Sequence, residues 1–169
     1  MLRWVGAALV FAGCGALGIL LAGRLSGKVK ALRAMAAALE QMEREMGFRL
    51  ASMPELLESA AKTAGPPADG FFQRCLDGLE QLGEKSLAEI WEETLDWAGD
   101  LGDPALAALR GLGVVLGQYD GESQRESLAG TRRELERCLQ EARAEQARLG
   151  RVYTTLGITA GAVLAILLL

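Results

Sequence analysis

The chain has 169 residues, of which 50% are hydrophobic, 24% are charged and none is histidine. The lack of histidine excludes a Ser-His-Asp triad, a Cys-His pair and a histidine-ligated metal site. The formal net charge of −4 argues against a dedicated nucleic-acid binder, which would be strongly basic.

An uncharged apolar segment lies near the amino terminus, from Trp4 to Gly23. A helix needs roughly 20 residues to cross a bilayer core of about 30 Å. Backbone groups in lipid must form hydrogen bonds within their own segment, so a crossing segment is helical. We therefore predict a transmembrane helix over residues 4–23 and an extracytoplasmic position for residues 1–3.

A signal peptide with a lipid-modified cysteine is an alternative for this segment. The tetrapeptide Phe11-Ala12-Gly13-Cys14 resembles a lipoprotein processing site. The apolar run, however, continues to Ala22, where a processed lipoprotein usually has a polar tether. The sequence therefore favours a membrane helix in which Cys14 is a small buried side chain.

Residues 24–151 form a polar middle segment that contains all 22 acidic side chains and 17 of the 18 basic ones. A segment of this size buries about two-thirds of its unfolded surface when it folds. Its composition favours helices, because Ala, Leu, Glu, Gln and Arg are abundant and β-branched residues are scarce. We predict an all-α fold, in which a cytoplasmic bundle of about six helices has outer helices continuous with the membrane segments.

The first half of this middle segment contains three predicted helices. Apolar residues spaced by seven form a coiled-coil-like seam to about Gly47, namely Leu25, Leu32, Leu39 and Met46. Ser52-Met53-Pro54-Glu55 is a capping box with proline in the first turn, and it opens a helix that ends near Thr63. An apolar stripe over residues 71–82, followed by Gly83 as C-cap, predicts the third helix.

Residues 78–86 mimic a phosphate-binding loop, because two glycines precede Lys85-Ser86. The spacing is one residue too long, and no strand is predicted before it. A phosphate loop needs consecutive backbone amides at a strand-to-helix turn. The three cysteines include no CxxC pair and predict neither a zinc site nor a disulfide framework, so we expect reduced thiols, no metal and no cofactor.

Two more helices are predicted before the last one. Ser86-Leu87-Ala88-Glu89 is a second capping box. The helix that it opens carries Trp91 and Trp97, which we expect in the core or at the edge of the bundle. Asp103-Pro104 predicts the N-cap and first turn of a helix that ends near Gly117.

Nine acidic residues lie from Asp77 to Asp103, and Lys85 is the single basic residue among them. Such a surface attracts a basic partner and speeds the encounter; a solvated helix face is the alternative. Neighbouring helical residues point about 100° apart and do not converge for acid–base catalysis, so we predict no enzymatic activity. The candidate partner contacts are Glu89, Glu92, Glu93, Asp96, Asp100 and Asp103.

The last predicted helix begins within residues 121–123 and runs into a second uncharged segment, residues 152–169. This segment is just long enough for a second transmembrane helix. Small residues spaced by four allow close helix packing in lipid, although small residues are common in membrane helices generally. They are Ala8, Ala12 and Ala16 in the first segment and Gly157, Gly161 and Ala165 in the second.

Basic residues flank the inner ends of both apolar segments. Arg24, Lys28, Lys30 and Arg33 follow the first segment, and Arg143, Arg148 and Arg151 precede the second. Outside them there is only Arg3. The positive-inside bias therefore predicts that the middle segment lies in the cytoplasm and that both termini lie across the membrane.

Three short stretches, taken in their order and spacing, are typical of one known family. They are Leu-Ala-Glu-Ile-Trp-Glu-Glu at 87–93, Leu-Gly-Gln-Tyr-Asp-Gly-Glu-Ser-Gln at 116–124 and Tyr-Thr-Thr-Leu-Gly-Ile-Thr-Ala-Gly at 153–161. By these stretches the chain resembles the stage III sporulation protein AB family of endospore-forming bacteria, although Ile90 stands where alanine is typical. Leu116, Gly117, Asp120 and Gln124 match a family element. Physically, Gly117 and Asp120 would shape the turn into the last helix, with Asp120 at or near its N-cap, or serve as a contact.

The resemblance implies a component of the channel complex that links mother cell and forespore. The family is similar to the inner-membrane platform domain of type II secretion and type IV pilus machines, which couples a cytoplasmic ATPase to an assembly across the membrane. It implies a non-enzymatic platform in the mother-cell membrane around the forespore. Its implied partners are the cytoplasmic ATPase, stage III sporulation protein AA, and other channel components, with a homo-oligomer as an option and without nucleic acid or a small-molecule substrate.

A second hypothesis comes from another class of protein. It is an exported or lipid-anchored helical structural protein without an ATPase partner. The side of the membrane on which the middle segment lies distinguishes the two hypotheses.

Overall fold

The computed structural model describes the backbone of residues 2–49, 52–116 and 121–168. It describes the side chains of residues 23–48, 52–116 and 121–149, and those of Thr155 and Thr159. Within these ranges the chain forms six α-helices and two 3₁₀ turns, and the only β-type pairing there is one isolated bridge. The predicted all-α fold is confirmed.

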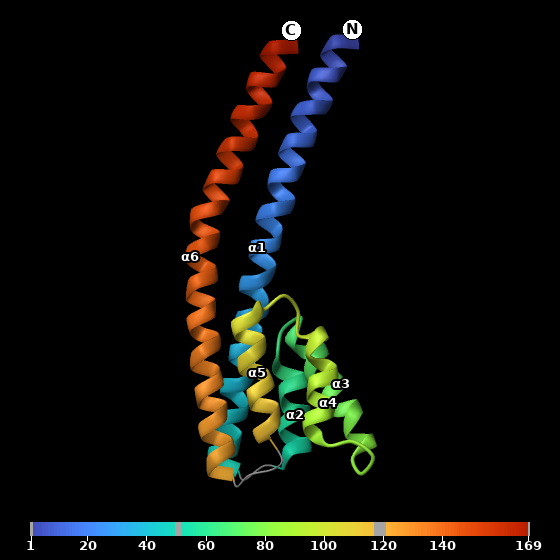
Figure 1. Cartoon of the computed structure of the whole chain (residues 1–169), viewed down its shortest axis with the longest axis vertical. Coiled ribbons are helices and arrows are strands. Elements are labelled where there is room, and N and C mark those ends of the chain that lie inside the picture. The colour runs from blue at the N-terminus through green and yellow to red at the C-terminus, as the bar shows by residue number, and fades with distance from the viewer. Residues whose placement is uncertain (1, 50–51, 117–120, 169) are drawn as a thin grey trace. The chain divides into compact units, whose positions relative to one another are not determined.

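The helices follow one another in the order shown in Figure 1. They are α1 (Leu2–Arg49), α2 (Met53–Thr63), α3 (Ala68–Gly78), α4 (Leu87–Thr94), α5 (Asp103–Val115) and α6 (Gly121–Leu168). The 3₁₀ turns are η1 (Leu79–Gln81) after α3 and η2 (Leu95–Trp97) after α4. Tertiary contacts divide the chain into two compact units, one of residues 1–27 with 141–169 and one of residues 28–140.

The outer helices α1 and α6 each contain 48 residues without a break. Where side chains are described, no helix has a stretch that is both long enough and apolar enough to cross a membrane. Apart from Gly23, Thr155 and Thr159, the side chains of the two predicted spans lie outside that part of the chain. The same holds for Cys14 and for the small-residue ridges at Ala8, Ala12, Ala16, Gly157, Gly161 and Ala165. Their membrane placement and packing stay predictions.

In the unit of residues 28–140, the short helices α2 to α5 lie beside the adjoining parts of α1 and α6 (Figure 1). The hydroxyl of Ser59 on α2 donates a hydrogen bond of 2.5 Å to Glu45 on α1. Leu32 and Leu39 of the predicted seam on α1 are fully buried, and so are Leu128 and Leu135, spaced by seven on α6. Burial of apolar side chains at these positions stabilises the unit by about 25 cal/mol for each Å² removed from water.

The centre of this unit is an aromatic cluster around Trp91, which is 1% exposed. The ring of Phe71 meets Trp91 edge-on at 4.8 Å between centroids, and that of Phe72 lies at 6.2 Å. The indole Nε1–H of Trp91 donates to the carbonyl oxygen of Leu109 at 2.9 Å, which satisfies the one polar atom of the ring. Gly113 on α5 leaves room for the indole, because a Cβ there would lie 2.8 Å from Trp91 Cγ.

The third predicted helix is shorter than the sequence suggested. It ends at Gly78, and η1 and a tight turn follow, in which Gly83 has a φ of +116°. Gly78 is in close contact with Ile90 of α4, where any Cβ would overlap the Ile90 side chain. Since the chain turns here, Leu82 is 51% exposed, and the predicted helical stripe does not extend to it.

The start of α5 also differs from its prediction. The N-cap is Gly102, with a φ of +80°, and Asp103 is the first helical residue rather than the cap. A side chain at Gly102 would come within 2.9 Å of Lys28 Nζ, and its φ is one that side chains disfavour. The helix ends at Val115, two residues before the predicted end, with Leu116 as its C-cap.

Candidate protein-binding surface

The first predicted contact residue, Glu89, caps the start of its own helix, α4. The backbone N–H of Ser86 donates to Glu89 Oε2 at 2.7 Å, and the Glu89 N–H donates to Ser86 Oγ at 3.3 Å. This is the predicted capping box, and it satisfies backbone donors at the start of α4. The hydrogen bonds from the Ser86 backbone and then from its hydroxyl lower the pKa of Glu89, so this carboxylate stays charged.

The next two predicted contacts, Glu92 and Glu93, are paired with cations. Arg110 Nε on α5 donates to Glu92 Oε1 at 2.7 Å. Lys85 Nζ reaches Glu93 Oε1 at 2.6 Å and Oε2 at 2.7 Å. All four side chains are partly exposed, so each pair contributes less than about 1 kcal/mol to stability. Their charge is nevertheless balanced within the chain.

The remaining three predicted contacts, Asp96, Asp100 and Asp103, are exposed. Within the described part of the chain they form no salt bridge. Asp96 precedes Trp97 directly in the chain, and the other two follow it. Trp97 is 54% exposed, and the guanidinium carbon of Arg74 lies 3.6 Å from its ring centroid. We call these five side chains the Trp97 surface. Here an aromatic ring in cation–π contact with Arg74 lies in the same chain segment as three exposed carboxylates that form no salt bridge among the described residues.

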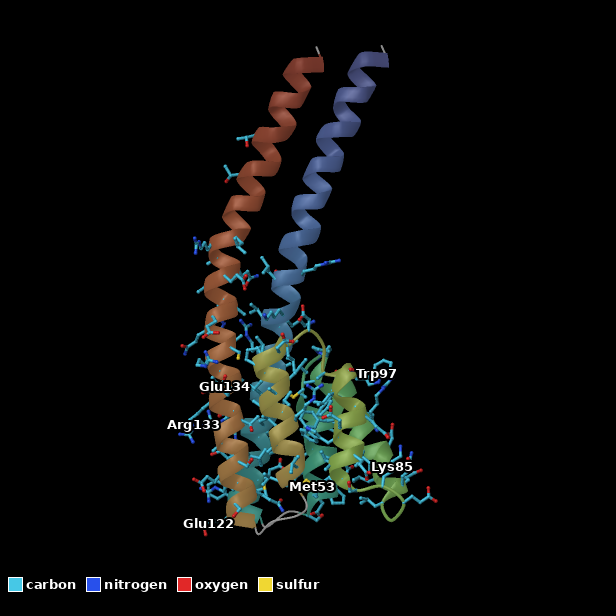
Figure 2. The ribbon with its side chains drawn as sticks, viewed as in Figure 1. Met53, Lys85, Trp97, Glu122, Arg133 and Glu134 are labelled. Carbon is cyan, nitrogen blue, oxygen red and sulfur yellow. The ribbon has the colours of Figure 1, made fainter. Side chains whose placement is uncertain are left out.

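An apolar groove lies at the opposite end of α4. It has a volume of about 360 Å³. Its apolar lining comes from the start of α2, from η1 and its turn, from the start of α4 and from the end of α5, with Met53, Leu79, Leu82, Leu87, Ala88 and Leu116. We call it the Leu82 groove. Figure 2 shows Met53 and Lys85 at this end of the short helices and Trp97 at the other.

The four residues of the family element do not all lie at this groove. Leu116 is buried and lines the groove. Gly117 and Asp120 lie outside the described residues, so the cap at Asp120 stays a prediction. Gln124 lies half-buried in the first turns of α6.

No group of three or more Cys, Asp or Glu side chains in the described part of the chain is arranged to hold a metal ion. Burial raises the pKa of Cys75 to about 12, only partly offset by its contact with the Thr94 hydroxyl at 2.9 Å. At neutral pH this thiol is protonated and a poor nucleophile. Fixed carboxylates, an exposed indole and an apolar groove are instead the chemistry of protein recognition.

Sequence reasoning missed the partners that come from distant parts of the chain. Arg110 lies 18 residues from Glu92 and on another helix. Arg74 precedes Trp97 by more than twenty residues, yet it covers one face of the ring. Both were outside the charge count that predicted the acidic cluster, since that count followed residues along the chain.

Comparison with known proteins gives one consistent match. The family model described as stage III sporulation protein AB matches residues 3–169. The curated stage III sporulation protein AB of Bacillus subtilis (strain 168) is 26% identical over 172 residues and is covered, like this chain, over its whole length. A solved structure of a stage III sporulation protein AB has a TM-score of 0.64 at 23% identity, covering 72% of this chain and 98% of that one. The structural match supports the fold.

Proposed function

The chain belongs to the stage III sporulation protein AB family and is a sporulation protein, and from this premise we propose that it is a non-enzymatic membrane platform of the channel between mother cell and forespore. In this proposal residues 4–23 and 152–169 cross the mother-cell membrane. Residues 24–151 lie in the cytoplasm. The excess of Arg and Lys beside the inner ends of both apolar segments supports this orientation.

We propose that the platform binds a cytoplasmic ATPase, stage III sporulation protein AA, through the Trp97 surface. The observation that carries this proposal is an exposed Trp97 held by Arg74 in the same segment as Asp96, Asp100 and Asp103. Tryptophan is enriched among residues that dominate binding energy at interfaces. Exposed carboxylates in the same segment would steer a basic partner and fix its orientation.

Partner binding would act on the membrane segments through α1 and α6. Each of these helices is continuous from the core to the apolar end of the chain. In an unbroken helix the i to i−4 hydrogen bonds run without interruption between its two ends, so a displacement at one end would be passed along its axis. The proposed role is therefore mechanical: contact on the short helices shifts the outer helices, and through them the channel components in the membrane.

The proposal is tested by the affinity of the purified ATPase for the full chain in lipid nanodiscs. Reversal of three charges, with Asp96→Lys, Asp100→Lys and Asp103→Lys together, should weaken binding by at least about tenfold, because the contact loses its complementary charge. The matched control reverses Glu122, Glu126 and Glu145, which are also exposed and lie on α6, and should leave the affinity within about twofold.

Two results would contradict the proposal in different ways. Equal affinity of both triple variants and the unaltered chain would remove the Trp97 surface from the contact. A lack of binding by the unaltered chain at micromolar concentration, at low salt where charge attraction is strongest, would remove the ATPase as partner.

A further inference from the structure

The Leu82 groove is an apolar surface that the fold holds open to solvent. Leu82 lies at its edge, 51% exposed, in the turn between η1 and α4. The turn is fixed by backbone hydrogen bonds from Leu82 N–H to the Leu79 carbonyl at 3.1 Å and from Lys85 N–H to the Gln81 carbonyl at 3.0 Å. Leu82 is thus held at a groove whose lining is mainly apolar, and exposed apolar surface of this kind is a candidate contact site.

Carboxylates follow the lining residues along the chain. Glu55 follows Pro54, Glu80 follows Leu79, Glu84 lies between Leu82 and Ser86, and Glu89 follows Ala88, and all four are exposed. Glu55 and Glu89 are held in place, because each accepts a backbone N–H at the start of its helix, from Ser52 at 2.8 Å and from Ser86 at 2.7 Å. The hydrogen bonds that hold them also keep their pKa below the usual value.

The nearest cation does not compensate this charge. Lys85 lies in the same turn, but its ammonium group is bound by both carboxylate oxygens of Glu93. The groove is therefore apolar inside, and four exposed carboxylates adjoin its lining residues along the chain, of which Glu89 is hydrogen-bonded to the lining residue Ser86. Anionic lipid headgroups and nucleic-acid phosphates are repelled by such carboxylates. A second copy of this chain is disfavoured as well, because it carries a net charge of −4.

We propose that the Leu82 groove binds a basic segment of a partner protein, which inserts a large apolar side chain between Leu79, Leu82 and Leu87 and places Lys or Arg side chains against the four carboxylates. The argument is charge complementarity around a preformed apolar surface, the common arrangement of an apolar anchor within a polar rim. Leu116 of the family element lines the groove, so the proposed contact would include a residue of that element. The contact is separate from the Trp97 surface and does not depend on the ATPase.

A displayed library of random 12-residue peptides is the probe for this inference. It is selected on the full chain in nanodiscs, and the enriched peptides are synthesised and measured by fluorescence anisotropy. Enriched peptides should combine a Leu, Phe or Trp with neighbouring Lys or Arg. Their affinity should fall at least about tenfold for Leu82→Ser, and by a similar factor for Glu80→Lys with Glu84→Lys, which leaves the apolar lining intact.

Matched variants outside the groove separate a specific contact from general stickiness. Val114 is 55% exposed and does not line the groove, so Val114→Ser should bind the peptides as the unaltered chain does. Glu122→Lys with Glu126→Lys, on α6, should do the same. Circular dichroism of each variant checks that its helices are retained.

Four results would overturn the inference. They are the enrichment of no peptide, enriched peptides without basic residues, and peptides that bind Leu82→Ser as tightly as the unaltered chain. The fourth is a dimer of the full chain in sedimentation that Leu82→Ser dissociates, which would make the groove a contact between copies. Because the probe is a peptide, failure here leaves the ATPase measurement unaffected, and the reverse is also true.

Discussion

Trp91 and Trp97, six residues apart, lie in two regions that differ in burial. Trp91 is 1% exposed, meets Phe71 edge-on and has its N–H bonded to the Leu109 carbonyl. Trp97 is 54% exposed, and the Arg74 guanidinium lies over its ring. The core region around Trp91 determines whether the short helices assemble. The Trp97 surface contributes little to the packing of the helices, so its residues can be substituted for partner binding without unfolding the chain.

The largest expected effect separates these two regions by stability. Trp91→Ala should destabilise the chain by about 3–5 kcal/mol, because a buried ring and its contacts are lost and a cavity remains. Trp97→Ala should cost less than about 1 kcal/mol, since its ring is already half in water. Urea denaturation of the full chain in detergent, followed by far-UV circular dichroism, measures both. Similar losses of stability for the two variants would refute the division.

Thiol reactivity also distinguishes the buried core from the exposed surface. Burial raises the pKa of Cys75 to about 12. At pH 8 its thiolate fraction is therefore on the order of a thousandfold below that of an ordinary exposed cysteine. Raising the pH from 7 to 9 should leave Cys75 unlabelled by a maleimide in the folded chain. A cysteine placed at exposed Ala107 should react faster as its thiolate forms. Rapid labelling of Cys75 under native conditions would contradict its buried position.

Two glycines of α5 offer a smaller, matched test. A Cβ at Gly113 would overlap the Trp91 indole, so Gly113→Ala should destabilise the chain by about 1–3 kcal/mol. Gly111 has no atom within 4 Å of its Cβ position, so Gly111→Ala should stabilise α5 by about 0.5–1 kcal/mol. Thermal unfolding of both variants checks the opposite signs. Equal shifts in the same direction would show that Gly113 is not packed against the indole.

The local signals in the sequence were sufficient for most of the fold. Ser52 with Glu55 and Ser86 with Glu89 form the two predicted capping boxes, because both partners lie within one turn of each other. The all-α class follows from composition in the same way. The end of α3 was missed because the stripe of apolar residues continues through Leu82, while the break depends on the contact between Gly78 and Ile90 of another helix.

The candidate site was less predictable, because it depends on residues that meet only in the folded chain. Charge counting along the sequence placed Glu92 among free acids, whereas Arg110 from α5 pairs with it. The same limitation applies to Arg132, which bonds Glu43 at 3.0 Å across 89 residues, and Glu43 is the main cause of its raised pKa. The groove at Leu82 was not predicted, since its lining comes from four separate segments.

In the proposed function the short helices lie on the cytoplasmic side of a membrane that both ends of the chain enter. Since Cys75 and Cys138 are buried, they do not report on topology, and an exposed Ala107→Cys is the suitable probe. The measurement is labelling of this variant by a membrane-impermeant maleimide in intact protoplasts and after permeabilisation, with the unaltered chain as background. If the short helices face the cytoplasm, Ala107→Cys is labelled only after permeabilisation. Labelling in intact protoplasts would place the domain outside the cell and contradict the proposed orientation.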